Sequence, residues 1–267
     1  MRYRIAYDEP GRLRVHFGPD AFTQEQGYGI AALLLGRPGV REAVTCALNG
    51  SVLVCYEGEG RAEALAAEIA AAGGQTALLP GDVSDPAQAA ALVRAAEEQL
   101  GPLDALVCNA GVALPQQLLT DTTDEQWRQV MGVDLDGVFY TLRAAVPGFV
   151  LRQRGAIVTV SSMWGVTGGS CEVAYSAAKA AVIGLTRALA KELGPSGITV
   201  NCVSPGVIST EMNAHLDREA LAALAEETPL GAIGTPEDVA EAIWYLSSDA
   251  ARFVTGQVLA PNGGLVI

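Results

Sequence analysis

Several residue classes are scarce in this chain of 267 residues. Lysine and arginine together number 17 against 30 aspartates and glutamates, so the formal net charge is −13. Such a charge repels a polyanion, and we therefore expect no nucleic acid partner. No apolar run approaches the ~18 residues needed to span a bilayer, and the first residues lack the apolar core of a signal peptide. We expect neither secretion nor insertion into a membrane.

Cysteines are also few. The chain has five, an odd number, and none of them forms a CxxC pair. Three lie in apolar runs, as reduced and buried thiols do. This usage is typical of a protein in the reducing cytoplasm.

The residues that are abundant indicate a well-filled core. Half of the chain is hydrophobic, and 30 glycines and 13 prolines separate the apolar segments. From about residue 61 onward, helical patterns alternate with short apolar strands, which is typical of a parallel sheet covered on both faces. The sequence thus predicts an α/β fold with a doubly wound, Rossmann-like sheet. Helices are expected at 61–72, 86–100, 123–150 (interrupted near Pro147), 173–193 and from Thr235 onward, and strands at 76–79, 105–108, 156–160, 198–203 and 257–260.

The first 60 residues follow a different rhythm. A strand at 12–17, a helix at 23–35 and two strands around Asn49-Gly50 predict a ferredoxin-like β-α-β-β segment. The helix at 61–72 and the strand at 76–79 would either close a β-α-β-β-α-β unit or belong to the Rossmann half, and both readings stay open. We place the domain boundary between 1–57 and 58–267.

Ser162, Tyr175 and Lys179 are the strongest candidates for chemistry. Tyr175 and Lys179 are four residues apart on one helix, so they share a face. An ammonium beside a phenol lowers the pKa of the tyrosine towards neutrality, which suits a general acid and base. Ser162 follows a strand, at the edge where open α/β sheets hold ligands, and its hydroxyl can polarise a carbonyl. The chain has only two lysines.

With these residues the chain resembles the short-chain dehydrogenase/reductase family from about residue 50 onward. The resemblance also rests on GDVSD at 81–85, CNAG at 108–111, PGVIST at 205–210 and TGQVLAPNGG at 255–264. It implies that Tyr175 is the general acid and base, and that Lys179 holds Tyr175 and the ribose of a nicotinamide cofactor. The other implied cofactor contacts are Asp82, Val83, Asn109, Ala110, Gly111, Pro205, Gly206, Ile208 and Thr210.

The chain departs from the family pattern in the helix before the serine strand. The family usually has an asparagine there, in a VNL stretch, whereas this chain has Asp134 in VDL. An ionised carboxylate only accepts hydrogen bonds, whereas an amide also donates. Asp134 is therefore a fourth candidate catalytic residue, or an ordinary polar residue of the helix.

A second departure concerns the phosphates of the cofactor. The family opens with a strand and a TGxxxGxG turn, in which glycines let the backbone approach the pyrophosphate. No such turn exists here. The nearest stretches, 23–29 and 35–41, carry glycines at the wrong spacing, and we interpret both as ordinary helix or loop.

Residues 1–57 instead resemble the heavy-metal-associated-like domains. The similarity rests on PGRLRVHFGPDAFTQEQGYGIAALL, RPGV and NGSVLVCYEG. The metal-binding CxxC of those domains is missing, Cys46 and Cys55 lie on separate strands, and His16 is interpreted as a strand residue. We predict no metal site.

Partners, cofactor and substrate follow from the remaining features. The helix at 173–193 is small and apolar on several faces, which predicts a homo-oligomer, either a dimer or a tetramer. Family habit favours NADP, with NAD as the alternative.

The stretch around Trp164 and Cys171-Glu172 resembles the elongation factor P 5-aminopentanone reductases and the 3-oxoacyl-(acyl-carrier-protein) reductases. A small-molecule or protein-attached ketone is the expected substrate, and Glu172 would attract a substrate amine. The rival hypothesis is an inactive scaffold or interaction protein that cannot hold a dinucleotide.

Overall fold

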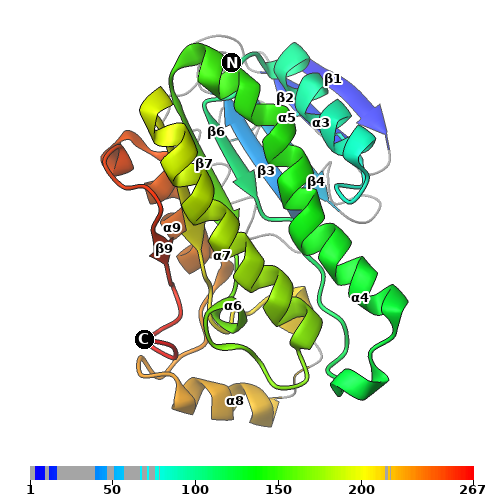
Figure 1. The fold of residues 1–267 in the computed structure, drawn as a ribbon, viewed down its shortest axis with the longest axis vertical. Coiled ribbons are helices and arrows are strands. Elements are labelled where there is room, and N and C mark those ends of the chain that lie inside the picture. Colours follow the sequence, from blue (N-terminus) through cyan, green and yellow to red (C-terminus); the bar gives the residue numbers. More distant parts are fainter. Residues whose placement is uncertain are drawn as a thin grey trace.

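The computed structural model describes residues 4–9, 12–16, 40–46, 51–56, 67, 71, 76–77, 79–213, 216 and 218–267. From residue 76 onward, strands and helices alternate to the C-terminus (Figure 1). The helix predicted at 23–35, most of the one predicted at 61–72, and the glycines of both stretches considered for the phosphate turn lie outside the described residues.

Four parallel strands form the sheet of the C-terminal part. They are β6 (Ala105–Cys108), β7 (Gly155–Val160), β8 (Ile198–Val203) and β9 (Val258–Leu259), in the order β6-β7-β8-β9. Every residue of β6 is buried, as expected of a strand covered on both faces. The first three strands match their predictions, whereas β9 is shorter than expected.

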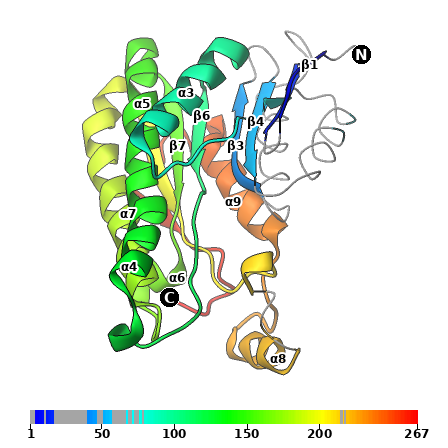
Figure 2. The same cartoon turned by 90° about the vertical axis from the view of Figure 1, so that its right-hand side faces the viewer.

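Helices cover both faces of this sheet. Figure 2 shows α3 (Pro86–Leu100), α5 (Gly137–Arg152) and α7 (Val173–Leu193) on one face and α9 (Pro236–Ser247) on the other. The doubly wound, Rossmann-like arrangement is therefore confirmed. None of the helices in the described part of the chain is long and apolar enough to cross a membrane.

The helix starts follow from their capping residues. The Asp85 carboxylate accepts hydrogen bonds from the backbone amides of Ala87 and Gln88 at the start of α3. Thr123 and Gln126 form a capping box on α4 (Asp124–Met131), and Thr235 forms one on α9. These predicted helix starts are confirmed.

The predicted interruption near Pro147 is wrong. Pro147 lies inside α5, which continues to Arg152. The break falls earlier, at a π-helical turn, η2 (Gly132–Asp136), between α4 and α5. Short π-helical insertions occur mostly at functional sites, and this one carries Asp134 into the interior.

The N-terminal strands form a second sheet. They are β1 (Arg4–Glu9), β2 (Arg12–His16), β3 (Val40–Cys46), β4 (Ser51–Tyr56) and β5 (Thr76–Ala77). The hairpin predicted around Asn49-Gly50 is present, with Cys46 opposite Ser51. The sequence analysis missed β1, which pairs antiparallel with β2 across Pro10-Gly11, two residues typical of a turn.

The short strand β5 agrees with both predictions for the strand at 76–79, as part of the N-terminal unit and as part of the Rossmann half. It pairs antiparallel with β2 and parallel with β4. The spatial order β5-β4-β3, then β6-β7-β8, corresponds to the 3-2-1-4-5-6 order of a Rossmann sheet, because β3 contacts β6 (Figure 2). β3 thus occupies the place of the first Rossmann strand, but it runs antiparallel to β4.

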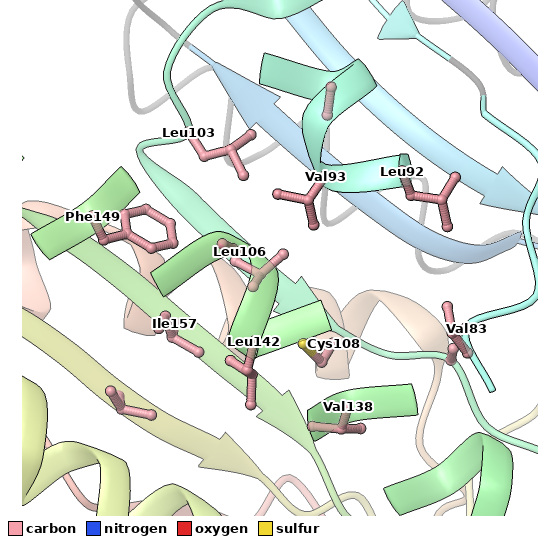
Figure 3. Close-up of a cluster of buried hydrophobic side chains, with 14 of the residues drawn as sticks. Val83, Leu92, Val93, Leu103, Leu106, Cys108, Val138, Leu142, Phe149 and Ile157 are labelled. Atoms are coloured by element: carbon pink, nitrogen blue, oxygen red, sulfur yellow. The ribbon is translucent and has the colours of Figure 1, made fainter. Parts of the chain in front are cut away.

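The largest core cluster lies between this sheet and α3, α5 and α7. Phe149 of α5, Leu106 of β6 and Ile157 of β7 are almost fully buried in it (Figure 3). This packing fixes the strands in register and leaves their carboxyl ends to carry the polar residues. The remaining short elements are α6 (Met163–Thr167), α8 (Arg218–Glu227), and the turns η1 (Leu119–Asp121), η3 (Gly194–Ser196), η4 (Glu211–Asn213) and η5 (Asp249–Ala251).

Candidate active site

Tyr175 and Lys179 lie one turn apart near the N-terminus of α7. The Lys179 ammonium lies 5.5 Å from the centre of the Tyr175 ring. It also donates a hydrogen bond of 3.3 Å to the carbonyl of Val160, the last residue of β7. The predicted pair is therefore held against the carboxyl edge of the sheet.

Ser162 is placed by the strand that it follows. Its hydroxyl accepts a hydrogen bond of 3.2 Å from the Trp164 amide and so caps α6. The Ser162 hydroxyl also faces Tyr175 and lowers the pKa of its phenol. The three residues predicted from the sequence are brought together from two different elements.

Asp134 reaches the same place from η2. Its Oδ1 accepts a hydrogen bond of 2.8 Å from the Val112 amide, and its Oδ2 lies 3.2 Å from Lys179 Nζ. The side chain is fully buried. Asp134 is thus not an ordinary polar residue of a helix, because it is the ion-pair partner of Lys179.

Burial controls the charges of this cluster. Burial raises the pKa of Tyr175, the Lys179 ammonium lowers it, and Asp134 raises it again; the net direction is upward. The predicted shift of the Tyr175 pKa towards neutrality is therefore wrong for this structure. Burial also raises the pKa of Asp134, against the opposing pull of Lys179. For Lys179, burial lowers the pKa, but Asp134 and Tyr175 outweigh it and the net direction is upward.

Two backbone segments predicted as cofactor contacts lie beside these side chains. Asn109, Ala110 and Gly111 follow β6, and a Cβ at Gly111 would lie only 3.0 Å from Lys179 Nζ. A side chain at this position would require Lys179 or Asp134 to move by a few tenths of an ångström. Pro205 and Gly206 follow β8, and the Pro205 carbonyl accepts a hydrogen bond of 2.9 Å from the Met163 amide.

The other predicted cofactor contacts are more dispersed. Asp82 is exposed, and its carboxylate accepts hydrogen bonds from the amide and hydroxyl of Ser84. Val83 is buried in the main core cluster. Ile208 is buried and pairs with Gly234, whereas Thr210 is exposed.

The geometry fits the nicotinamide end of a dinucleotide. An ammonium has three N–H donors, and Lys179 directs them at Asp134 and Val160 among the described residues, which leaves one for a ribose hydroxyl. The pyrophosphate end would lie near the start of the chain. β3 and β4 are antiparallel, so the first residue of β3, Val40, lies opposite the carboxyl end of β4. β3 therefore does not form the phosphate-binding turn that would follow a parallel first strand.

Two supporting residues were not predicted. The Ser161 hydroxyl donates a hydrogen bond of 2.8 Å to the Lys179 carbonyl, which ties α7 to the end of β7. Gly165 lets α6 approach α7, because a Cβ there would lie 2.7 Å from the Lys179 backbone. Both flank Ser162 in SSMWG, so their position in the motif was the available signal.

Metal ligation finds no support in the described residues. They contain no group of three histidine, cysteine or acidic side chains that could hold a metal ion. The side chains of His16, Cys46 and Cys55 lie outside what the structure describes.

The family model described as enoyl-(acyl carrier protein) reductase matches residues 39–266. This match covers most of the chain and begins inside the N-terminal segment, earlier than the resemblance noted in the sequence. The chain belongs to the short-chain dehydrogenase/reductase family of NAD(P)-dependent oxidoreductases.

Three relatives show the range of proteins that this chain resembles. It is 37% identical over 216 residues to a 3-oxoacyl-(acyl-carrier-protein) reductase of Staphylococcus aureus, covering 80% of this chain and 87% of the relative. It is 39% identical over 241 residues to an L-rhamnose 1-dehydrogenase (NAD(P)(+)) of Azotobacter vinelandii, covering 87% and 93%. It is 44% identical over 210 residues to a protein of Xanthobacter autotrophicus named inactive 2-(S)-hydroxypropyl-CoM dehydrogenase 2, covering 76% and 90%.

Proposed function

We propose that this protein reduces a ketone to an alcohol with NADPH, and with NADH as the alternative cofactor. The observation that carries the proposal is the contact of Ser162, Tyr175 and Lys179 at the carboxyl edge of a doubly wound sheet. The cofactor assignment is supported by the relatives, one of which is named for NAD(P)(+).

Each residue of the site has its own role in the proposed reduction. Bound NAD(P)H supplies the hydride that forms the new C–H bond at the carbonyl carbon. Tyr175 donates its hydroxyl proton to the carbonyl oxygen, which forms the alcohol O–H bond and leaves a phenolate. Ser162 holds the carbonyl oxygen by a hydrogen bond, and the Lys179 ammonium stabilises the phenolate that develops. Asn109, Gly111, Pro205, Gly206, Ile208 and Thr210 would line the nicotinamide half of the cofactor, and Asp82 and Val83 the adenine half.

Cofactor binding and turnover test this proposal separately. Titration of the full chain with NADPH, and separately with NADH, is expected to show saturable nucleotide fluorescence at micromolar concentrations. The Tyr175→Phe variant should keep this binding and lose about 10²- to 10⁴-fold in ketone reduction, the usual contribution of a general acid. The control is Tyr245→Phe, on the opposite face in α9. Undiminished turnover in Tyr175→Phe would refute the assignment.

A second candidate is an inactive scaffold. Two observations favour it: β3 is antiparallel where the phosphate-binding strand is expected, and a relative 44% identical to this chain is named as inactive. Under this alternative, the folded protein binds neither nucleotide. The same titration therefore decides between the two.

The proposed reaction leaves two candidate classes of ketone substrate. We keep two substrate classes, a 3-oxoacyl thioester and the 5-aminopentanone group on elongation factor P. Glu172, the residue before α7, raises the pKa of Tyr175 and so acts on the site through its charge, which favours a substrate amine. Reduction of an aminoketone in preference to a neutral ketone of equal length would support the second class.

Residues 1–57 are proposed as a heavy-metal-associated-like contact module without a metal.

We also propose that the protein is a homo-oligomer in the cytoplasm. Ala177, Ala180, Gly184 and Ala188 of α7 are exposed in the single chain, and Phe139, Val150 and Leu151 of α5 are exposed large apolar residues. A second copy of the chain would cover these neighbouring helices.

A further inference from the structure

The Asp134–Lys179 ion pair is closed to solvent. The exposed fraction is 0% for the Asp134 side chain and 3% for the Lys179 side chain. Each carboxylate oxygen has one partner, since Oδ1 accepts from the Val112 amide and Oδ2 faces the ammonium. The π-helical turn and the Val112 amide thus hold the Asp134 carboxyl group against the Lys179 ammonium.

The charges that face Tyr175 are unequal in number. Lys179 of α7 is the one cation acting on it, whereas Asp134 of η2 and Glu172 before α7 are both acidic. Ser162, between β7 and α6, contributes a neutral hydroxyl, and the buried Cys202 thiol of β8 acts on Lys179. The effect of the ammonium on a phenolate is therefore opposed by the charge of its own partner, Asp134.

We propose that Asp134, by pairing with Lys179, opposes the ionisation of Tyr175 and thereby extends to higher pH the range in which its hydroxyl can donate a proton to a ketone. The chemical consequence rests on the proposed function. Ketone reduction requires the phenol, so the pair delays the loss of reduction that ionisation of Tyr175 would cause as the pH rises. Asp134 is a positioning residue, because it acts through Lys179 and not on the substrate.

The pKa directions agree with the geometry. Burial raises the pKa of Tyr175, Lys179 lowers it, and Asp134 is the second influence that raises it. Asp134 also holds the pKa of Lys179 up against burial, so the ammonium stays charged but paired. Replacement of the carboxylate by an amide would remove the opposing charge of Asp134, so the positive charge on Lys179 would act on Tyr175 without it.

A titration without cofactor or substrate tests the proposal. Tyrosinate absorbance near 295 nm is recorded against pH for the full chain and for its Tyr175→Phe variant, and the difference isolates Tyr175 from the other six tyrosines. The same pair of titrations is made in an Asp134→Asn background. Asparagine keeps the shape of the side chain and the oxygen that accepts from Val112, so the fold is expected to persist and circular dichroism would check it.

The Tyr175 titration is expected to move to lower pH in Asp134→Asn. The matched control is Asp104→Asn, which also removes a buried carboxylate with a basic partner, Arg154, but lies before β6 at the other end of the sheet. It should leave the titration in place. An unchanged or higher midpoint in Asp134→Asn, or an equal shift in Asp104→Asn, would overturn the proposal.

A second readout addresses the reaction. If the enzyme turns over, kcat/KM for ketone reduction should begin to fall at a lower pH in Asp134→Asn than in the parent chain, because the phenol that donates the proton ionises earlier. A folded protein that titrates as expected but binds no nucleotide would refute the proposed function and leave the inference intact. A protein that turns over with the same pH profile in Asp134→Asn as in the parent chain would refute the inference alone.

Discussion

Tyr175 and Lys179 show how a pair at helical spacing depends on its surroundings. Four residues of separation on α7 place the two side chains together, but burial and Asp134 reverse the expected direction of the Tyr175 pKa. The spacing is local, whereas the ion pair joins residues 45 positions apart. Sequence reasoning found the pair and Asp134, but not their contact, because the contact depends on the π-helical turn.

The raised pKa values of Tyr175 and Lys179 predict that the folded protein loses stability at alkaline pH. The folded-state pKa values of Tyr175 and Lys179 are raised above their ordinary 10.0 and 10.5. The unfolded chain therefore releases these protons first, and the stability they contribute is present below about pH 10 and lost as the pH rises through the folded values. Each group changes the unfolding free energy by up to about 1.4 kcal/mol per pH unit in that window.

Urea unfolding at pH 8, 9, 10 and 11 measures this loss. The free energy of unfolding should fall slightly between pH 8 and 9, where the Cys202 thiol, whose pKa burial raises from 9.0, begins to ionise in the unfolded chain, and more steeply between pH 10 and 11. The fall should be shallower in Asp134→Asn, since Asp134 is the main influence that raises the Lys179 pKa. A constant free energy up to pH 11 in the parent chain would contradict the assigned directions.

At the scale of elements, capping residues and apolar periodicity carried the sequence analysis. Asp85, Thr123 and Thr235 predicted three helix starts, because their side chains replace missing backbone partners within a few residues. Pro147 was misleading: a proline usually ends a helix, yet α5 passes through it. The apolar pattern does not predict the π-helical turn, because the contact that the turn makes possible, between Asp134 and Lys179, joins residues distant in the sequence.

The close approach of α6 and α7 gives a prediction at this scale. A Cβ at Gly165 would lie 2.5 Å from Ser161 Oγ and 2.7 Å from the Lys179 backbone. Gly165→Ala should therefore separate the two helices and lower the unfolding free energy by about 1–3 kcal/mol, the usual cost of overpacking. Thermal unfolding followed by circular dichroism measures the change.

Gly194→Ala is the matched control for this substitution. Gly194, at the C-terminus of α7, has nothing within 4 Å of the added Cβ and has a right-handed helical backbone. Its melting temperature should stay the same or rise. Equal losses in both variants would mean that the contact at Gly165 is not the cause.

For the whole molecule, the order of motifs along the chain was enough to predict the parallel sheet and its helices. The N-terminal part was predicted less completely, because β1 and the position of β3 beside β6 depend on long-range pairing. Strand patterns indicate that a strand forms, but they do not specify its neighbour or its direction.

The exposed face of α7 predicts the effect of a charge on assembly. Ala180 is exposed in the single chain, and an arginine there would be buried without a partner if a second copy covers this helix. Ala180→Arg should reduce the assembled species to a single chain in sedimentation velocity. Ala91→Arg, at an exposed position of α3, should leave assembly unchanged. Persistence of the oligomer in Ala180→Arg would move the interface elsewhere.

The boundary between the two sheets has a consequence for hydrogen exchange. β6 is paired with β7 along one side, while along its other side it contacts β3 without belonging to the same ladder in the described strands. Backbone amides of β6 that point towards β7 should be protected nearly to the limit of global unfolding, and those that point towards β3 should exchange sooner. The molecule would then open first along this boundary, between its N-terminal strands and the sheet that carries the site.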